Sequence, residues 1–179
     1  MNTQFTIVNV VATAALNQPM DLELLRERFP KNILYDRDIY GGRVAYFKTK
    51  NMEGKVSIFW SGKLISVGTK SVEKAKQELQ LTAKTLKTSL KIKPKIQNIV
   101  ATTTLQCPIE IGNIIKKIQK HCSIIYEPEQ FPGAIITLTL SRKSKATILL
   151  FSSGKVVCVG LKDPKNIAVA IHYLLKIIS

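Results

Sequence analysis

The sequence predicts an α+β fold in which two tandem copies of one unit contribute strands to a single antiparallel sheet. The first observation is an internal repeat. Residues 7–16, IVNVVATAAL, and residues 96–105, IQNIVATTTL, are identical at six of ten positions. Residues 59–68, FWSGKLISVG, and residues 151–160, FSSGKVVCVG, also share six of ten. Matches at a nearly constant offset are the mark of a repeated structural unit.

A third match lies between these pairs of segments. Six residues separate Tyr35 from Gly42, and six separate Tyr126 from Gly133. The offset between the copies changes by only a few residues along the chain, which small loop insertions explain. One match could arise by chance between apolar strands, but three in the same order indicate a duplication.

Each copy is expected to form one strand, a short helix, four strands and a long helix. Val, Ile and Thr are frequent in residues 5–16, as is typical of a strand. Pro19 and Asp21 indicate the start of a short helix, and so do Pro108 and Glu110 in the second copy. The helices are expected over residues 20–28, 71–88, 109–121 and 164–178, with Ser71 and Asp163 as N-caps of the long ones.

The copies are expected to occupy residues 1–90 and 91–179 and to form one domain together. The joining segment KIKPK, residues 91–95, is too short for a free linker, so both halves are expected to share one ten-stranded sheet. Two helices per half would then cover one face of this sheet.

The uncovered face of this sheet is expected to be apolar too. Along residues 9–13 and 63–68, apolar residues occur in both sets of alternating positions. A sheet covered by helices on one side normally carries polar residues on the other. An apolar open face indicates a partner that excludes water. The same pattern also fits a sheet buried on both sides, as in a sandwich.

The charge of the chain favours a polyanionic partner. Lys and Arg number 27 against 12 Asp and Glu, a net charge of +15 that is spread over both halves. Nucleic acid fits this balance best and an anionic membrane second. The N-terminus lacks the basic region of a signal peptide, and no apolar run reaches the length of a membrane span. Three cysteines without a CxxC pair favour a reducing compartment without disulfides.

No catalytic, metal-binding or phosphate-loop motif is found in the sequence. His121 and His172 lack the spacing of metal ligands, and residues 62–70 have the wrong residue order for a phosphate loop. The sequence therefore predicts a protein that is not an enzyme and that needs no cofactor or metal.

Several strings resemble the TATA-box-binding protein family, and together they extend over essentially the whole chain. The second copy contains YEPEQFPG at 126–133 and ILLFSSGKVVCVG at 148–160. The first copy carries YDRDIYGG at 35–42 and VSIFWSGKLISVG at 56–68 in the equivalent places. VNVVAT and QNIVAT resemble the family's first strand, and the order of the motifs follows the family's duplication.

This resemblance implies a pseudo-twofold saddle, with one curved ten-stranded antiparallel sheet and four helices on its convex face. The concave face would bind the minor groove of A·T-rich TATA-box promoter DNA and kink it with aromatic wedges, as the family does. The implied partners are double-stranded promoter DNA, a B-type general transcription initiation factor and, indirectly, RNA polymerase. A homodimer through the apolar face is expected without DNA, and no membrane is implied. The EQFPG string is typical of archaeal members, which would act in the cytoplasm at the nucleoid; a eukaryotic member would be nuclear.

The family uses two Phe wedges in each half. Phe131 and Phe151 match them in the second half and Phe59 in the first, whereas Tyr40 takes the fourth place. A Tyr ring can still stack, but its hydroxyl needs a partner when it is inserted between base steps. Apart from the resemblance, Phe59 and Phe151 also fit ordinary core positions.

The resemblance places Asn9 and Asn98 at the centre of the site. An amide NH2 can donate to the acceptors that both orientations of an A·T pair display in the minor groove. Lys63 and Lys155, in the two SGK turns, are candidate phosphate contacts, and a solvated Lys is the alternative for each. The other expected DNA-contacting residues form an apolar floor: Val11, Ile65, Val67, Val100, Leu149, Val157 and Val159.

The sequence departs from the family at several of these positions. Val67 and Val159 replace a usual Thr, so base discrimination is expected to depend on the Asn pair and on DNA deformability. Tyr46 and Thr137 are taken as the places where the family tends to have Arg, and Ser57 stands where a large apolar residue is usual. These departures raise a second hypothesis: a specialised paralogue that acts as a regulator or protein-interaction scaffold, with altered or weak DNA specificity.

Two surfaces are candidates for protein partners. Glu127, Glu129 and Gln130 match positions with which the family contacts the B-type factor. A basic stretch, either a solvated face or a contact for flanking DNA or an acidic regulator, comprises Lys70, Lys74, Lys76, Lys84, Lys87, Lys91, Lys93 and Lys95. Some ribonucleases and DNA glycosylases carry a half-saddle as an appendage, but such an enzyme would need a catalytic domain for which this chain has no room.

Overall fold

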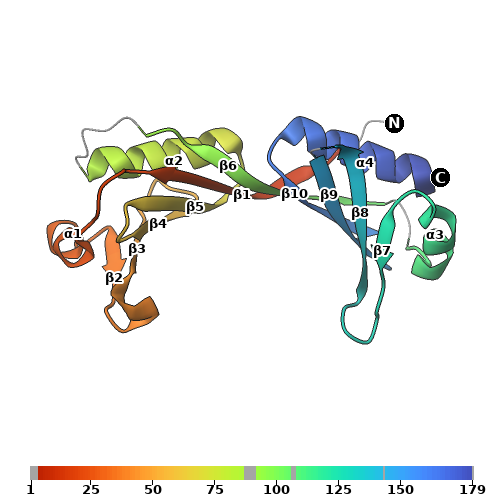
Figure 1. Cartoon of the computed structure of the whole chain (residues 1–179), viewed down its shortest axis with the longest axis horizontal. Helices are drawn as coiled ribbons and strands as arrows, with labels where there is room; N and C mark the ends of the chain where they lie inside the picture. Colours follow the sequence, from red (N-terminus) through yellow and green to blue (C-terminus); the bar gives the residue numbers. More distant parts are fainter. Residues whose placement is uncertain (1–3, 87–91, 106–107, 143, 179) are drawn as a thin grey trace. The chain divides into compact units, whose positions relative to one another are not determined.

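The computed structural model describes residues 4–86, 92–105, 108–142 and 144–178 (Figure 1). Both copies follow the predicted order of one strand, a short helix, four strands and a long helix. The elements of the first copy are β1 (Thr6–Ala15), α1 (Leu22–Arg28), β2 (Ile33–Tyr35), the short 3-10 helix η1 (Ile39–Gly42), β3 (Val44–Phe47), β4 (Lys55–Phe59), β5 (Lys63–Thr69) and α2 (Val72–Thr85). Those of the second are β6 (Lys95–Thr104), α3 (Ile111–Ile118), β7 (Ser123–Ile125), β8 (Gly133–Ser141), β9 (Ser144–Phe151), β10 (Lys155–Leu161) and α4 (Pro164–Ile178).

The helix starts follow the predicted capping residues. The Ser71 hydroxyl accepts a hydrogen bond from the Lys74 backbone N–H at 3.1 Å, and Pro164 is the first residue of α4, directly after Asp163. The two short helices begin later than expected, because Asp21 and Glu110 are N-caps in extended conformation rather than helical residues. Lys87, Lys91, Cys107 and the end of the helix expected to reach residue 88 lie outside the described residues.

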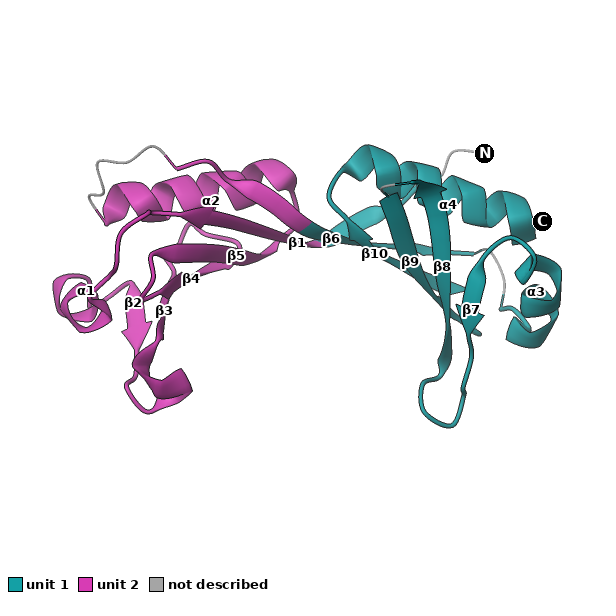
Figure 2. Cartoon of the chain, in the orientation of Figure 1, with its two compact units in different colours: residues 1–8, 98–179 teal, residues 9–97 magenta. Residues whose placement is uncertain are grey.

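The ten strands form one sheet, in the order β2-β3-β4-β5-β1-β6-β10-β9-β8-β7. The predicted ten-stranded antiparallel sheet with four helices is therefore confirmed. The chain divides into two compact units, coloured separately in Figure 2. We call residues 9–97 the first-copy unit, and residues 1–8 with 98–179 the second-copy unit. The boundaries fall within β1 and β6, so each of these strands contributes residues to both units.

In each unit the long helix covers one face of the sheet. α2 packs on β4 and β5, and α4 packs on β8 and β10. Strand side chains on this covered face are fully buried, as at Val10, Ala12, Leu64, Ile99, Ala101 and Val156. The alternate positions are mostly half-buried, because no described element lies over them within either unit. Within the described residues of each unit, the sheet is thus not buried on both faces, and the sandwich alternative does not apply.

The sheet register shows that the loop between the second and third strands of the first copy is two residues longer than its counterpart. Eight residues separate Tyr35 from Val44, and six separate Tyr126 from Gly133. Val44 lies opposite Phe59, and Gly133 lies opposite the equivalent Phe151. Val44, rather than Gly42, is therefore the strand equivalent of Gly133.

This register corrects one prediction about equivalent positions. Tyr46 lies opposite Ser57, and Ile135 lies opposite Leu149. Tyr46 is therefore the counterpart of Ile135, whereas Thr137 lies two residues further along β8. Treating Tyr46 and Thr137 as equivalent was wrong, because counting from the Tyr and Gly motifs missed the two-residue insertion.

Candidate nucleic-acid interface

The face of the sheet opposite the helices carries the residues expected to form the apolar floor. We call it the open face of each unit. Val11, Ile65 and Val67 lie half-buried on the open face of the first-copy unit. The second-copy unit presents its expected floor residues in the same way: Val100, Leu149, Val157 and Val159. Apolar side chains left half-covered over several adjacent strands are typical of a binding surface.

Asn9 and Asn98 make the same hydrogen bond in the two units. The Oδ1 atom of Asn9 accepts from the Gly68 backbone N–H at 2.8 Å, and that of Asn98 accepts from the Gly160 N–H at 2.8 Å. Only the oxygen of a carboxamide can accept from an N–H. The NH2 group of each Asn is therefore the end that remains for a partner on the open face.

An irregularity in the sheet explains why these two glycines need a side-chain acceptor. The register between β1 and β5 shifts between Val10 and Ala12, and that between β6 and β10 shifts between Cys158 and Leu161. Gly68 and Gly160 have φ of 92° and 88°, in the left-handed region that favours glycine. A backbone N–H lost from the strand ladder requires another acceptor, and the Asn side chain supplies it. The recurrence of Asn thus has a structural cause as well as a candidate function.

The two SGK turns have the same backbone bonds. The Gly62 N–H donates to the Phe59 carbonyl at 2.8 Å, and the Gly154 N–H donates to the Phe151 carbonyl at 2.9 Å. Each turn is also bonded to the chain beside it, since the Leu16 N–H donates to the Gly62 carbonyl at 2.9 Å and the Leu105 N–H donates to the Gly154 carbonyl at 2.8 Å. Each turn therefore sets one Phe on the open face and one exposed Lys, Lys63 or Lys155, at the start of the next strand.

In the second-copy unit, the two expected wedge residues contact one another. The rings of Phe131 and Phe151 are 5.7 Å apart between centroids, in an edge-to-face arrangement. Gly133 lies beneath them: a Cβ atom there would be 3.1 Å from Phe131 and 3.0 Å from Phe151. The absence of a side chain at Gly133 thus allows the two rings to meet.

The first-copy unit has a different arrangement at the equivalent place. Tyr40 has a φ of 53° and is 69% exposed. Tyr40 and Phe59 line one hollow together with Tyr46, Ser57 and other residues. Among the described residues, the only aromatic ring pair in contact is that of Phe131 and Phe151.

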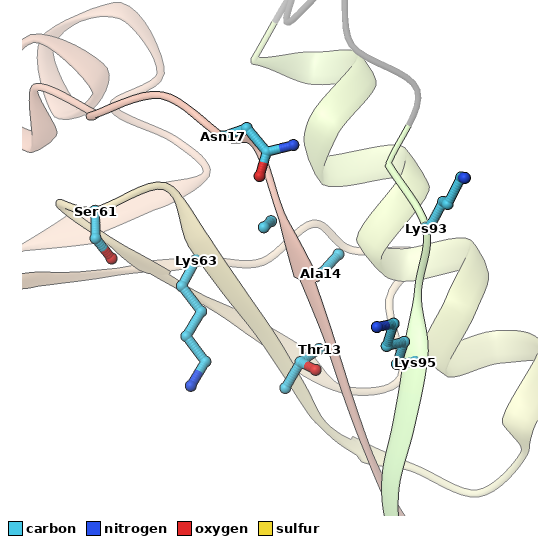
Figure 3. Close-up of a pocket in the computed structure, with 8 residues that line it drawn as sticks. Thr13, Ala14, Asn17, Ser61, Lys63, Lys93 and Lys95 are labelled. Atoms are coloured by element: carbon cyan, nitrogen blue, oxygen red, sulfur yellow. The ribbon is translucent and has the colours of Figure 1, made fainter.

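A basic hollow of about 620 Å³ lies at one end of the first-copy unit, and its lining includes Lys63, Lys93 and Lys95 (Figure 3). Figure 3 shows Lys63 on the β5 side of β1, and Lys93 and Lys95 on the other side, at the start of β6. Lys63, a predicted phosphate contact, thus lines the same hollow as two lysines that the sequence analysis assigned only to the general basic stretch. The combined positive charge suits a phosphate backbone.

Part of the predicted basic stretch is neutralised within the protein. The Glu53 carboxylate accepts a hydrogen bond from the Lys70 backbone N–H at 2.9 Å and lies 3.5 Å from the Lys74 ammonium group. The Lys70 backbone bond, with the charge of Lys74 assisting it, lowers the pKa of Glu53 below its ordinary value. Lys74 therefore acts in part as an internal ion-pair partner.

The residues expected to contact a protein partner lie together in an exposed turn. Glu127, Glu129 and Gln130 are all exposed. The turn is closed by the Glu127 carbonyl, which accepts from the N–H groups of Gln130 and Phe131 at 2.9 Å each. Two carboxylates thus project from the same loop that carries the Phe131 ring.

The structure adds open-face residues that the sequence interpretation did not propose as DNA contacts. Thr13 lies opposite Ile65, and Thr102 lies opposite Val157. Both are half-buried and bring a hydroxyl to the otherwise apolar floor. The repeated VAT triplet was the signal for them, because it places a Thr at the same point of each copy. Trp60, 54% exposed beside Phe59, was also missed, because the second copy has Ser152 there.

Neither a metal cluster nor a membrane span is present in the part of the chain that the structure describes. No three His, Cys, Asp or Glu side chains gather there as metal ligands. None of the described helices is both long and apolar enough to cross a bilayer.

Comparisons with known proteins agree with this architecture. The family model described as "Transcription factor TFIID (or TATA-binding protein, TBP)" matches residues 4–89 and again residues 93–179. The chain is 36% identical over 165 residues to the TATA-box-binding protein of Methanothermobacter thermautotrophicus, covering 89% of this chain and 86% of the relative. It is 34% identical over 170 residues to that of Cenarchaeum symbiosum, covering 92% and 88%.

A solved structure supports the same assignment. The fold is similar to that of Methanococcus jannaschii TBP, with a TM-score of 0.80, 30% sequence identity and coverage of 98% of both chains. The family model matches each copy separately, and the relatives match over most of the chain. The chain therefore belongs to the TATA-binding protein family of transcription factors.

Proposed function

We propose that the open faces of the two units bind the minor groove of A·T-rich promoter DNA. The observation that carries this proposal is the pair of Asn side chains, each held by a glycine N–H so that its NH2 group remains for a partner. In the minor groove, A·T pairs of either orientation present only acceptors, whereas a G·C pair adds the guanine amino group. Two amide donors on an apolar floor therefore favour A·T over G·C.

The apolar floor, the two lysines, the aromatic residues and the exposed carboxylates would each have a separate role. The half-buried Val and Ile side chains would contact sugars and base edges, while Lys63 and Lys155 would contact phosphates. Phe131 with Phe151 would enter a base step at one end of the site and Phe59 with Tyr40 would act at the other, which kinks the duplex. Exposed Glu127 and Glu129 would then contact a basic surface of the B-type initiation factor, which brings RNA polymerase to the promoter.

Binding and bending of short duplexes test the first part of this proposal. We expect the protein to bind a TATA duplex more tightly than a scrambled or a G·C-rich duplex, and end-to-end fluorescence energy transfer to report a large bend. Lys63→Ala and Lys155→Ala should each weaken binding to all duplexes and lower the slope of log affinity against log salt by about one. Equal binding to all three duplexes with a steep salt slope and no bend would instead support the scaffold hypothesis.

Recruitment is tested separately from DNA binding. Glu127→Lys with Glu129→Lys should abolish the ternary complex with the B-type factor on TATA DNA, seen as the loss of a supershifted band, but leave the binary complex in place. Asp36→Lys with Asp38→Lys, in the corresponding loop of the first copy, is the matched control and should keep the ternary complex. Loss of the ternary complex in both variants would assign the effect to charge in general rather than to Glu127 and Glu129.

A further inference from the structure

An aromatic hollow of about 440 Å³ opens in the first-copy unit, at the end of its open face. Its lining includes Tyr40, Arg43, Tyr46, Ser57, Phe59 and Trp60. We call this space the aromatic hollow.

Three positions around the hollow differ between the copies. Ser57 occupies the place that Leu149 fills in the second copy, so a small side chain replaces a bulky one at the floor. Tyr46 replaces Ile135, and Trp60 replaces Ser152, so aromatic rings replace smaller side chains around that floor. The small Ser57 side chain therefore leaves space between the aromatic side chains around it.

The hollow is continuous with the proposed DNA-binding surface. Ser57 lies opposite Ile65 of the apolar floor in the register of β4 and β5. Phe59, one of the expected wedges, is in its wall. A duplex bound on the open face would therefore extend directly over the hollow.

The chemistry of the hollow fits an aromatic ring attached to an anionic backbone. The Lys55 ammonium group lies 4.5 Å from the centre of the Tyr46 ring, and Arg43 is in the lining. No described lining residue is acidic. Tyr40 and Trp60 remain 69% and 54% exposed, so large planar surfaces are available for stacking.

We infer that the aromatic hollow takes one unstacked base of the DNA bound on the open face. This inference rests on the function proposed above and adds a difference between the two ends of the site. At the second-copy end, Phe131 and Phe151 already contact one another, so that end acts as a wedge. At the first-copy end, the base stacks between aromatic side chains, as bases do in single-strand binding proteins, while Arg43 and Lys55 face its phosphates.

The single tryptophan of the chain makes the hollow observable. Trp60 emission is followed as the full chain binds a TATA duplex, and then duplexes in which one base at either terminal step is replaced by an abasic site. We expect the intact duplex to quench Trp60. An abasic site at one end should remove most of the quenching while the bend persists, whereas one at the other end should leave the quenching unchanged.

Variants at the hollow floor test whether its volume is responsible. Ser57→Leu, which restores the side chain of the second copy, should abolish the quenching and weaken binding roughly 5- to 150-fold, as expected for the loss of one base stacked on aromatic side chains. Ser57→Ala keeps the space and should keep the quenching. Tyr46→Ile, which removes a wall instead of filling the floor, should reduce the quenching and serves as a second variant should Ser57→Leu not fold.

The outcomes separate this inference from the proposed function. A TATA duplex that is bound and bent with no quenching of Trp60, or with quenching that neither the abasic sites nor Ser57→Leu alter, overturns the inference alone. Quenching of Trp60 by the B-type factor but not by DNA also overturns it, and would assign the hollow to an apolar side chain of that protein. Absence of any duplex binding overturns both.

Discussion

The loops between the second and third strands differ between the copies, although the sheets that they join are alike. We call residues 36–43 the first stirrup and residues 127–132 the second stirrup. In the first stirrup, Tyr40, Gly41 and Gly42 all have left-handed φ, at 53°, 60° and 67°. The second stirrup is a compact turn closed on the Glu127 carbonyl. The same position in a duplicated fold is thus built in two ways.

The stirrups differ while the sheets agree because the hydrogen bonds between paired strands constrain the sheets but not the loops. The Asn–Gly bonds and the SGK turns are the same in both units, because backbone groups there have a required partner. The stirrups extend beyond the paired strands, so a two-residue insertion changes their path without disturbing the sheet. Duplicated parts remain alike where hydrogen bonds constrain them, and they diverge in the loops that carry the proposed wedges.

The largest effect is expected at the two Asn–Gly hydrogen bonds, which are the same in both copies. Asn9→Asp with Asn98→Asp keeps an oxygen to accept from each glycine N–H, but it replaces each NH2 donor with a carboxylate oxygen. We expect affinity for TATA DNA to fall roughly 100-fold or more, because the new charges face acceptors on the bases, with thermal stability nearly unchanged. Fluorescence anisotropy and thermal unfolding measure the two quantities. Asn9→Asp and Asn98→Asp alone should weaken binding equally. A tenfold difference between these two variants would show that the copies differ at the Asn positions as well as in the stirrups.

A smaller effect is expected at the wedges, where the copies differ. Phe131→Ala removes a ring that already packs on Phe151, and it should lower DNA affinity about 10- to 100-fold and reduce the bend seen by energy transfer. Tyr40→Ala removes an exposed ring with no ring partner among the described residues, and it should lower affinity about 5-fold or less. Equal losses for the two variants would contradict the proposed difference between the ends.

Alanine at Gly42 in the first stirrup and alanine at Gly133, which directly follows the second stirrup, should have different effects. Gly42 has a φ of 67°, and a Cβ atom there would lie 2.9 Å from the Tyr35 hydroxyl, so Gly42→Ala should lower the free energy of unfolding by about 1–2 kcal/mol. Gly133→Ala requires no left-handed φ, and it should instead separate the Phe131 and Phe151 rings and weaken DNA bending. Urea denaturation and energy transfer measure these effects. A Gly133→Ala variant with an unaltered bend would show that ring contact is not needed for the wedge.

The smallest effect at neutral pH, which grows only as the pH is raised, concerns two equivalent buried residues on the helix-covered face. Ser66 and Cys158 occupy equivalent positions, and both are fully buried. Burial raises the pKa of the Cys158 thiol to about 11, because the thiolate loses its hydration. The unfolded thiol ionises at lower pH, so the contribution of Cys158 to stability is fully present below about pH 8 and is lost as the pH rises towards its folded pKa.

The expected loss is about 1 kcal/mol over roughly one pH unit within this range. Cys158→Ser, which copies the residue of the first unit, should remove this part of the pH dependence, and Ser66→Cys should add a similar part. Urea denaturation of the three proteins at about pH 8, 9 and 10 measures the difference. Identical pH profiles for the wild type and Cys158→Ser would show that the thiol does not ionise differently on unfolding.

Sequence patterns were sufficient for the elements and the face on which the candidate site lies. The repeat predicted the element order, and the caps at Ser71 and Asp163 predicted the starts of the long helices. The equivalence of Tyr46 and Thr137 was predicted wrongly, because spacing between motifs does not reveal where an insertion lies within a loop. Trp60 was missed because the second copy has Ser152 in its place, and Thr102 was missed because its position on the open face depends on the strand beside it.

By itself, the sequence determined the duplication, the ten-stranded sheet with four helices and the family, because apolar periodicity and repeated motifs are properties of the chain in order. Only the tertiary structure decided which atoms meet across strands. It set Asn9 and Asn98 against the glycines of two irregular strands, brought Phe131 onto Phe151, and left a hollow over Ser57 where Leu149 fills the other copy. The physical reason is register: a hydrogen bond or a ring contact depends on which residues lie opposite one another, and one insertion in a loop changes that without altering the pattern of apolar residues.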